Sequence, residues 1–388
     1  MKKIIFVTRQ MVMGGIEKAL ISMLETIPKD EFDITILVMA NGGELVDDLP
    51  DYVKVKCLFG DEQSTRERVI NDFKKGKFAA AFKTGYYSLL ARKAKTVFEQ
   101  EFYHSKMLPK GKERYDMAIA FHTPASFPVV YVIDNIIANK KVAWIHSDVT
   151  QYERELQPYK EYYSKFDKVF CVSKYAMDKF TDMYPDLKKR TAVFYNIIDC
   201  IKMDKLSMEK GFEDRFNGTK ILTVGRLTSQ KGQDLIPSIL KLLTLAGFKI
   251  RWYCIGEGEG RAELENLIKK NQLEEHLILL GNLNNPYPYM KQCDIYVQPS
   301  RHEGYCITLA EARAFNKPII TTDFVGAREQ IIDGETGIIV DFDNRQIFEQ
   351  ISLLLKNTSF KQQLQCNLKR NDLSNKTNVE NLLKVLKQ

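Results

Sequence analysis

The segment from Ser300 to Ala312 reads SRHEGYCITLAEA and lies between two short apolar runs, Asp294 to Gln298 and Pro318 to Thr322. Both runs have the length and composition of buried strands, whereas the residues from Ile307 to Phe315 favour a helix. A strand, a loop, a helix and a second strand in this order predict one repeat of a parallel α/β sheet. The loop is then expected at the carboxyl edge of the sheet, where ligands bind in open α/β folds.

The same alternation of short apolar runs and amphipathic stretches extends over most of the 388 residues. Further strands are expected at Lys3 to Thr8, Asp33 to Met39, Val53 to Leu58, Met117 to Phe121, Lys141 to Ile145, Val169 to Ser173, Ala192 to Tyr195, Lys220 to Val224, Ile250 to Ile255 and Leu277 to Leu280. Helices are expected near Glu17 to Thr26, Asp234 to Leu245, Arg261 to Asn271, Gln346 to Lys356 and Val379 to Leu386. The pattern predicts an α/β protein with two Rossmann-like, doubly wound parallel-sheet domains.

The charged segment from Ile197 to Thr219 interrupts the alternation and is expected to be an irregular linker. We therefore expect an N-terminal domain over residues 1–196 and a C-terminal domain over residues 197–375. A last helix is expected in residues 376–388. Two domains of this kind facing each other would form a deep cleft for ligands.

Composition excludes several classes of protein. The hydrophobic fraction of 44% is normal for a globular chain, and no apolar run approaches the ~20 residues of a membrane-spanning helix. The start, MKKIIFVT, fits a first strand better than a signal peptide, which predicts a cytoplasmic protein. Seven scattered cysteines without a CxxC pair argue against a disulfide framework and against a thiolate zinc site.

The net charge of +7 is concentrated in one region, residues 63–114, which is expected to be helical. Between Arg66 and Arg114 there are thirteen Lys or Arg residues against five Asp or Glu, and aromatic residues lie between them. Such a stretch favours peripheral contact with an anionic membrane surface, here the inner face of the cell membrane. The alternatives are a solvated helix face whose apolar side packs inward and, least favoured, a nucleic-acid site, so no nucleic-acid partner is predicted.

Two carboxylates, Glu303 and Glu311, lie eight residues apart around the expected start of a helix. Gly304 permits a close turn, and the amides of residues 306–309 should be free to bind phosphate at the helix N-terminus. Carboxylates on either side of a bound diphosphate could hold hydroxyl groups of a sugar and of a ribose.

This segment resembles the E-x7-E signature of retaining glycosyltransferases of the GT-B fold, family 4, of the bacterial surface-polysaccharide type. Four further segments resemble features of that family: GGIEKAL from Gly14, WIHSD from Trp144, YNIID from Tyr195 and VGRLTSQKG from Val224. The resemblance implies a nucleotide-sugar donor, with a UDP-sugar favoured. It further implies that the last helix, in residues 376–388, crosses back to the first domain. It also implies an acceptor hydroxyl on a glycan or lipid-linked glycan in capsule or cell-wall polysaccharide synthesis.

The resemblance assigns roles to individual residues. His146, Glu303, Arg226 and Lys231 form the expected catalytic set, in which the two cations bind the donor diphosphate and stabilise the charge that grows on it. Glu303 is expected to contact the transferred sugar, and Glu311 the ribose. The remaining expected substrate contacts are Gly14, Gly15, Gly256, Asn284, Gly304, Tyr305, Cys306, Ile307 and Thr308. Cys306 departs from the glycine or proline that many relatives carry at this position.

No cofactor and no metal ion are expected, because cationic side chains can hold the diphosphate. The letters Asp341-Phe342-Asp343 match a metal-binding DxD, but their place before a helix favours a helix cap. Two other functions stay open: a GT-B epimerase acting on a nucleotide sugar, and a non-catalytic nucleotide-sugar-binding protein.

Overall fold

The computed structural model describes residues 1–12, 14–39, 43–58, 64–108, 110–369, 375 and 378–387. The chain divides into two compact units: unit 1 comprises Met1–Ile197 and Lys376–Gln388, and unit 2 comprises Ile198–Asn375. The division lies one residue after the expected boundary. Some residues of the expected basic region and of the expected C-terminal segment lie outside the described residues, namely Gln63, Pro109, Lys376, Thr377 and Gln388.

Unit 1 is built on a parallel sheet with the strand order β3-β2-β1-β4-β5-β6-β7. The strand bounds are β1 Lys2–Thr8, β2 Phe32–Val38, β3 Lys54–Cys57, β4 Arg114–His122, β5 Ile137–Ile145, β6 Lys168–Cys171 and β7 Thr191–Val193. The last five residues of β1 are all buried, which is typical of a strand that helices cover on both faces. Strands buried on both faces appear in the sequence as continuous apolar runs, and not as an alternation of apolar and polar residues.

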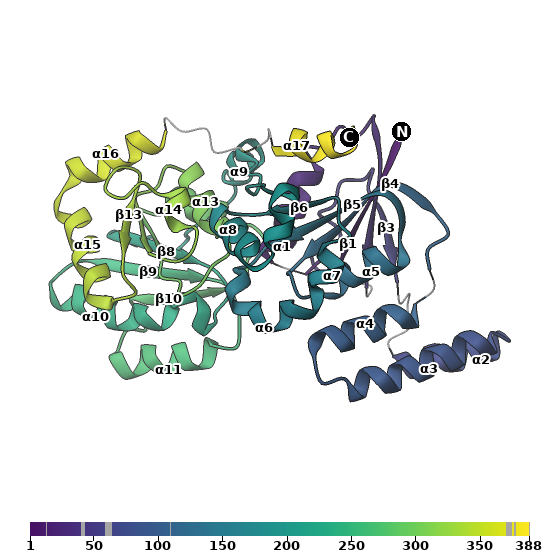
Figure 1. The fold of residues 1–388 in the computed structure, drawn as a ribbon. Helices are drawn as coiled ribbons and strands as arrows, with labels where there is room; N and C mark the ends of the chain where they lie inside the picture. Colours follow the sequence, from purple (N-terminus) through teal and green to yellow (C-terminus); the bar gives the residue numbers. More distant parts are fainter. Residues whose placement is uncertain are drawn as a thin grey trace. The chain divides into compact units, whose positions relative to one another are not determined.

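The helices of unit 1 connect these strands (Figure 1). Their bounds are α1 Gly15–Leu24, α2 Thr65–Lys74, α3 Phe78–Lys93, α4 Val97–Met107, α5 Phe127–Asn135, α6 Glu153–Leu156, α7 Lys160–Tyr163, α8 Lys174–Met183 and α17 Asn378–Val385, with 3-10 turns at Val149–Tyr152, Gln157–Tyr159 and Pro185–Arg190. The basic region is helical, as expected, and its first helix begins at a capping box between Ser64 and Glu67.

Unit 2 has a parallel sheet with the strand order β10-β9-β8-β11-β12-β13. The strand bounds are β8 Thr219–Val224, β9 Ile250–Ile255, β10 Leu277–Gly281, β11 Ile295–Gln298, β12 Ile319–Thr322 and β13 Ile338–Val340. The helix bounds are α9 Cys200–Leu206, α10 Ile236–Leu245, α11 Arg261–Asn271, α12 Tyr287–Gln292, α13 Ile307–Ala314, α14 Ala327–Gln330, α15 Asn344–Lys356 and α16 Thr358–Leu368, with 3-10 turns at Ser229–Lys231 and Gln233–Leu235. Two sheets of this kind confirm the predicted fold class.

The expectation of an irregular linker was wrong in part. Helix α9 lies in the first half of that segment, and the carboxylate of Asp199 caps it by accepting from the amides of Ile201 and Lys202. The helix was missed because its seven residues carry only one buried side chain, Met203, so no apolar period marks it.

Each unit has its own buried core. The two tryptophans of the sequence are divided between the cores, with Trp144 on β5 in unit 1 and Trp252 on β9 in unit 2. Both indole rings are almost completely buried. Each unit therefore carries one tryptophan in its interior, which can report on that unit by fluorescence.

Candidate functional site

The loop that follows β8 carries the two predicted cations of unit 2. Arg226 stands two residues beyond the strand, and Lys231 ends a 3-10 turn. The next residue, Gly232, has a left-handed φ of 72°, and a Cβ atom there would lie 1.8 Å from the carbonyl oxygen of Pro299. Only glycine permits this approach, which brings the end of the Lys231 loop against the end of β11.

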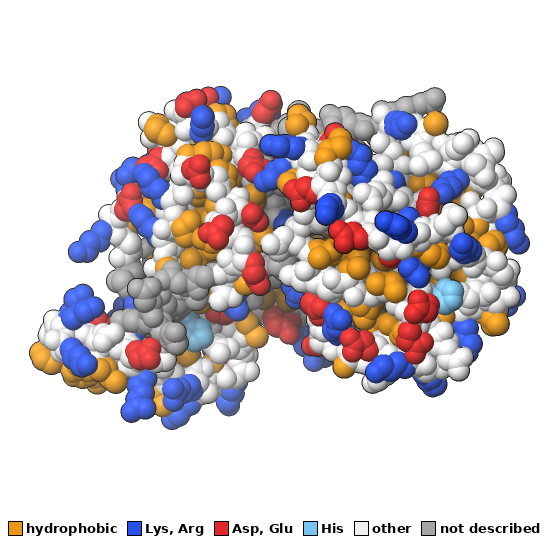
Figure 2. All heavy atoms as spheres, turned by 180° about the vertical axis from the view of Figure 1, so that it is seen from behind, with side chains coloured by type: hydrophobic (Ala, Val, Ile, Leu, Met, Phe, Trp, Pro, Cys, Tyr) orange, Lys and Arg blue, Asp and Glu red, His pale blue; other side chains and the backbone are white. Residues whose placement is uncertain are grey.

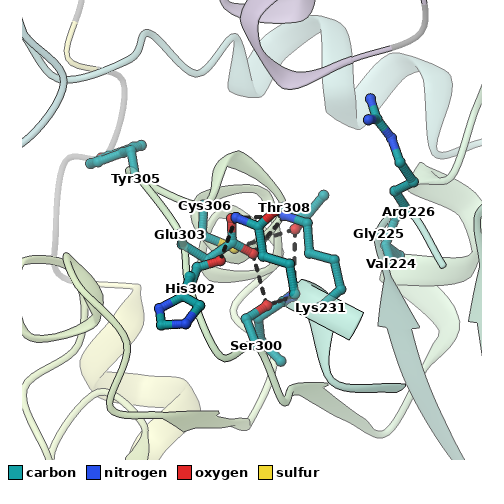
Figure 3. A network of polar contacts seen from close by, with 12 residues as sticks. Val224, Gly225, Arg226, Lys231, Ser300, His302, Glu303, Tyr305, Cys306 and Thr308 are labelled. Carbon is teal, nitrogen blue, oxygen red and sulfur yellow. Dashed lines mark hydrogen bonds and ion pairs between the residues drawn. The ribbon is translucent and has the colours of Figure 1, made fainter. Parts of the chain in front are cut away.

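Lys231 and Glu303 form a close ion pair at this edge of the sheet. The Lys231 Nζ lies 2.7 Å from both carboxylate oxygens, and the Glu303 side chain is only 7% exposed (Figure 3). Burial, the largest single influence, lowers the pKa of Lys231, but the attraction of Glu303 and the hydrogen bonds to it, with a contribution from Cys306, together outweigh burial. The net pKa is therefore raised, and the ammonium stays charged. Two N–H bonds of the ammonium point at Glu303, and the third can still serve a ligand oxygen.

A row of buried hydrogen bonds ends at the Glu303 carboxylate. The Tyr296 hydroxyl donates to the side-chain Oε1 of Gln298 over 2.7 Å, and the side-chain Nε2 of Gln298 donates to the Ser300 hydroxyl over 2.8 Å. Ser300 in turn donates to Glu303 Oε1 over 2.8 Å. Because all three donors point the same way, the row holds the carboxylate in one orientation and stabilises its charge.

Helix α13 begins directly after this carboxylate, at Ile307. Its N-cap, Cys306, has a left-handed backbone with φ 59° and ψ 81°, a region that favours glycine. Burial raises the pKa of the Cys306 thiol far above its usual range, so the thiol stays protonated. Thr308 in the first turn donates to Gln298 Oε1 over 3.3 Å and so ties the helix start to the hydrogen-bonded row.

Glu311 lies one turn inside α13 and is buried. Its Oε1 accepts from the Tyr287 hydroxyl over 3.0 Å. Tyr305 is also buried, and its hydroxyl lies 3.5 Å from the Asn375 amide nitrogen. Gly304, between the two carboxylates, lies opposite Gly326, where a Cβ atom would be 3.2 Å from the Gly304 carbonyl oxygen.

Arg226 is exposed and extends away from the Lys231–Glu303 pair (Figure 3). In the part of the chain that the structure describes, its side chain has no hydrogen bond and no ion pair. Its backbone is nevertheless fixed, because the Gln233 side-chain amide donates to the Arg226 carbonyl oxygen over 3.1 Å. The guanidinium is thus a cation on a rigid loop with all its donors available.

Gly256 supports the same loop from the neighbouring strand. Its φ is 140°, and a Cβ atom there would lie 2.1 Å from the Gly225 carbonyl oxygen. The Gly256 amide also donates to the Gly281 carbonyl oxygen over 2.8 Å. Asn284, in the loop that follows β10, is exposed. Close packing of the backbone therefore accounts for Gly256 in the segment after β9.

The interpretation of Asp341-Phe342-Asp343 as a helix cap is confirmed. Asp343 is the N-cap of α15, and its carboxylate accepts from the Gln346 amide over 2.8 Å. Asp341 accepts from the Gln346 side chain over 3.0 Å.

In unit 1, the other predicted residues lie near the carboxyl ends of strands. Gly14 is the N-cap of α1 and Gly15 its first residue, so both stand at the N-terminus of a ten-residue helix. His146 follows β5 directly and packs edge-on against Phe121 with ring centroids 4.3 Å apart. Burial lowers the pKa of His146 to about 3, so the ring is neutral near pH 7. Its Nε2 has no hydrogen-bond partner within the described residues.

A charged group that the sequence did not indicate lies at the same edge of the unit 1 sheet. Arg9, just after β1, pairs with the buried carboxylate of Glu101 on α4, and His104 Nδ1 lies 3.6 Å from the second oxygen of that carboxylate. His122 ends β4, next to β5 in the sheet. Burial and, to a lesser degree, Arg9 lower the pKa of His122 to about 4.

The structure thus brings Lys231, Glu303, Cys306 and Thr308 together and places Arg226 apart from them within unit 2. Gln298, Ser300 and Tyr287 were missed, although they belong to the same elements as the predicted residues or lie next to them. A polar residue inside an apolar strand, such as Gln298, was the available signal, because buried polar groups require partners.

The fold has counterparts among known structures. Two parallel-sheet Rossmann-like units occur in the GT-B glycosyltransferases, which are the structural neighbours of this chain. The crystal structure of Anabaena Alr3699/HepE in complex with UDP-glucose superimposes with a TM-score of 0.72 at 17% identity, covering 99% of this chain and 100% of that one. At this identity the likeness concerns the fold.

Residues 209–387 match the family described as glycosyl transferases group 1. A Campylobacter jejuni N-acetylgalactosamine-N,N'-diacetylbacillosaminyl-diphospho-undecaprenol 4-alpha-N-acetylgalactosaminyltransferase is 33% identical over 198 residues, 50% of this chain and 52% of the relative. The O-antigen biosynthesis glycosyltransferase WclY of Escherichia coli is 32% identical over 161 residues, 41% of this chain and 44% of the relative. The chain spans about half the length of the curated relatives that it matches, and these homologues include enzymes of bacterial polysaccharide synthesis.

Across the described residues, every helix is too short or too polar to cross a membrane.

Proposed function

We propose that the chain is a retaining glycosyltransferase that moves a hexose-type sugar from a nucleoside-diphosphate sugar to an acceptor hydroxyl. One observation carries the proposal: a buried carboxylate, Glu303, is held by a charged lysine and lies shortly before the N-terminus of α13, in the part of the chain that matches group 1 glycosyltransferases. Cations and free helix amides bind phosphate, and a fixed carboxylate accepts hydroxyl groups of a sugar.

In this proposal Arg226 and Lys231 bind the diphosphate of the donor. Lys231 can do so without releasing Glu303, because one N–H bond of its ammonium is unused. The amides of Ile307 and Thr308 at the start of α13 add further donors for phosphate oxygens. Glu303 then accepts from the transferred sugar and Glu311 from the ribose. Gly256, Asn284, Gly304, Tyr305 and Cys306 are the remaining proposed contacts of the donor. A UDP-sugar is favoured because Anabaena Alr3699/HepE, which has the same fold, was crystallised with UDP-glucose.

Retention of configuration requires that the acceptor oxygen bonds to the anomeric carbon on the face that the diphosphate leaves. The bond between the anomeric carbon and the diphosphate oxygen breaks with its electron pair, and the acceptor proton passes to a phosphate oxygen. Arg226 and Lys231 stabilise the negative charge that grows on the diphosphate, and this stabilisation replaces a metal ion. Loss of one such contact typically costs roughly 3 kcal/mol of barrier.

We further propose that unit 1 binds the acceptor and that Gly14, Gly15 and His146 take part in the reaction. His146 would act as a neutral imidazole, since its pKa lies far below 7. The acceptor is proposed to be a glycan on a lipid diphosphate, because the Campylobacter relative's name specifies a diphospho-undecaprenol acceptor. Such an acceptor would bring the protein to an anionic membrane surface.

A panel of nucleotide sugars tests the donor assignment. At 100 times its dissociation constant a ligand adds about 2.7 kcal/mol to the free energy of unfolding, which is readily seen as a higher melting temperature. We expect UDP-sugars to give the largest shifts and Arg226→Ala and Lys231→Ala to reduce them. The absence of a shift with every nucleotide sugar and nucleoside diphosphate would contradict the proposal.

Product analysis separates the two remaining alternatives. Formation of an epimerised nucleotide sugar from the donor alone would indicate an epimerase. Tight donor binding without release of nucleoside diphosphate, in the presence of membrane extracts that supply lipid-linked acceptors, would indicate a binding protein. Release that persists at the wild-type rate in His146→Asn, Glu303→Gln, Arg226→Ala and Lys231→Ala would refute the assigned residues.

A further inference from the structure

Helices α2, α3 and α4 of unit 1 form a helical arm, residues 64–108, that lies beside the parallel sheet and not within its layers (Figure 1). Helix α2 has no buried residue at all. Helix α3 buries only the small side chains of Ala81, Thr84 and Ala91. Helix α4, by contrast, is anchored to the unit through its buried residues Glu101, Ser105 and Met107. The first two helices of the arm therefore present most of their surface to solvent.

The large apolar side chains of α3 point outward. Phe78 and Phe82 are 63% and 75% exposed, and Tyr86 and Leu89 are exposed as well. Their spacing of four, four and three residues places all four on one face of the helix. The patch continues onto the end of α2, because the rings of Phe73 and Phe78 meet edge-on with centroids 5.7 Å apart.

This arrangement decides between two expectations for the basic region. A solvated helix would turn its apolar side inward and its charges outward. Helix α3 does the reverse with these four residues, since alanine and threonine pack inward while Phe78 and Phe82 face solvent. Contiguous exposed apolar surface of this kind marks a contact with a partner or a membrane.

The charge around the exposed apolar side chains favours a membrane over a protein partner. From Lys74 to Lys95 the chain has seven Lys or Arg residues and no Asp or Glu. All seven are exposed, and none forms an ion pair within the described part of the chain. Figure 2 shows basic side chains surrounding exposed hydrophobic ones on this lobe of the protein. Lysines with long apolar stems around a row of aromatic rings complement a surface that is anionic outside and apolar beneath.

We propose that the outer face of α2 and α3, formed by Phe73, Phe78, Phe82, Tyr86 and Leu89 with the surrounding lysines, docks on an anionic lipid bilayer. The helices lie in the plane of the interface, with the rings among the acyl chains and the ammonium groups at the lipid phosphates. The proposal goes beyond the transfer reaction and does not depend on it. Docking on a bilayer would serve any enzyme whose substrate lies in a membrane, whatever group the enzyme transfers.

Co-sedimentation of the full chain with vesicles tests the docking face. The probes are vesicles of phosphatidylcholine alone and vesicles with about one third phosphatidylglycerol, at low and high salt. We expect binding to the anionic vesicles that weakens as salt screens the lysines. The double variant Phe78→Ala/Phe82→Ala should bind at least about tenfold more weakly, since each ring removes apolar surface from the contact. Replacing Lys74, Lys75 and Lys77 by Gln should give a similar loss.

Leu245→Ala is the matched control, because Leu245 ends α10 in unit 2 and is 76% exposed outside the arm. It should bind vesicles like the unaltered chain. Thermal unfolding checks that the arm variants keep their fold, which is expected because the replaced side chains are exposed. The shift that a UDP-sugar gives should also be unchanged, so loss of docking and loss of donor binding are seen separately.

Three results would overturn the proposal. The first is equal binding of the arm variants and the Leu245 control. The second is equal binding to neutral and anionic vesicles. The third is a concentration-dependent dimer of the free protein that Phe82→Asp abolishes, which would make this face an interface between two copies.

Discussion

Lys231 and Arg226 carry the same charge in the same loop, but their surroundings differ. Lys231 compensates a carboxylate that is almost completely buried, whereas Arg226 is exposed and has no partner in the described residues. Removing one partner of a buried pair leaves an uncompensated charge, which is strongly destabilising. Removing an exposed, unpaired side chain changes stability little. The two cations can therefore be distinguished by stability although both are proposed to bind diphosphate.

We predict that Lys231→Ala lowers the free energy of unfolding of unit 2 by about 3 kcal/mol. Arg226→Ala should change it by less than about 0.5 kcal/mol. Both should weaken donor binding. Urea unfolding followed by Trp252 fluorescence in a Trp144→Phe background measures unit 2 separately. Lys231→Ala without a stability loss would mean that Glu303 finds another partner, such as a water molecule.

Two histidines of unit 1, the buried His146 and the half-buried His122, make its stability depend on pH. The pKa values of His146 and His122 are lowered to about 3 and about 4, mainly by burial. Between these values and the pKa of about 6.5 in the unfolded chain, the unfolded state binds more protons. Stability is therefore fully present above pH ~6.5 and is lost as the pH falls toward the folded pKa values.

Between pH 7 and pH 5 each of these two histidines should lower the free energy of unfolding of unit 1 by about 2 kcal/mol. The variant His146→Gln should remove about half of the loss that the two cause. Urea unfolding at each pH, followed by Trp144 fluorescence in a Trp252→Phe background, gives the slope. His302→Gln, at an exposed position in unit 2, is the control and should leave the slope unchanged.

For single residues, the sequence indicated which residue types belong to the site, but not which side chains contact each other. The order of arginine, lysine and two glutamates indicated a phosphate and sugar site. That Lys231 would contact Glu303, 72 residues away, follows from the close approach at Gly232, which no local pattern encodes. The pairing of Arg9 with Glu101 joins the end of β1 to a helix of the arm and was equally inaccessible.

At the scale of secondary-structure elements, Gly232 allows the loop after β8 to pack against the end of β11. The left-handed φ by itself costs an L-residue about 1 kcal/mol, as at any such position. The further cost arises because the Pro299 carbonyl oxygen, at the end of β11, occupies the space of a Cβ atom. Gly247, at the turn after α10, has a similar φ of 81° but nothing within 4 Å of that space.

Gly232→Ala should therefore lower the free energy of unfolding of unit 2 by more than about 3 kcal/mol, and Gly247→Ala by about 1 kcal/mol. Gly232→Ala should also weaken donor binding, because the loop that carries Lys231 must move. Urea unfolding and thermal shift with a UDP-sugar measure the two effects. Equal stability losses in both variants would show that β11 yields to the new methyl group.

Helices and strands could be predicted from the spacing of apolar residues where that spacing was regular. The bounds expected for α11 agree with the structure, and most expected strands lie within a few residues of the observed ones. Helix α5 was missed although it is almost entirely buried, because an apolar run of its length has no polar face to show a helical period. The exposed side of α3 could not be predicted, since its aromatic residues have the spacing of a buried face.

At the scale of the whole chain, unit 1 is made from two segments that lie far apart in the sequence. Helix α17 buries Val379, Leu382 and Val385, and the Asn378 side chain donates to the Tyr195 carbonyl oxygen over 3.1 Å. The Lys2 ammonium donates to the Leu386 carbonyl oxygen over 3.3 Å. The alternation of strands and helices predicted two sheets, but the contacts of the last helix had only the family resemblance behind them.

Deletion of residues 378–388 should lower the free energy of unfolding of unit 1 by about 5 kcal/mol, because three buried aliphatic side chains are lost. Unit 2 should be unaffected. The Trp144 and Trp252 transitions, each observed alone, measure the two units in one series. Lys384→Ala, an exposed change in the same helix, should leave both transitions in place. A parallel loss in unit 2 would mean that the two units unfold together.

The division of unit 1 into two segments has a consequence for biosynthesis. A ribosome makes residues 198–375 before it makes the helix that completes unit 1. Unit 2 can thus reach its final structure on the nascent chain while the first 197 residues still lack α17. Unit 1 would then finish folding after unit 2, although most of its residues are synthesised earlier.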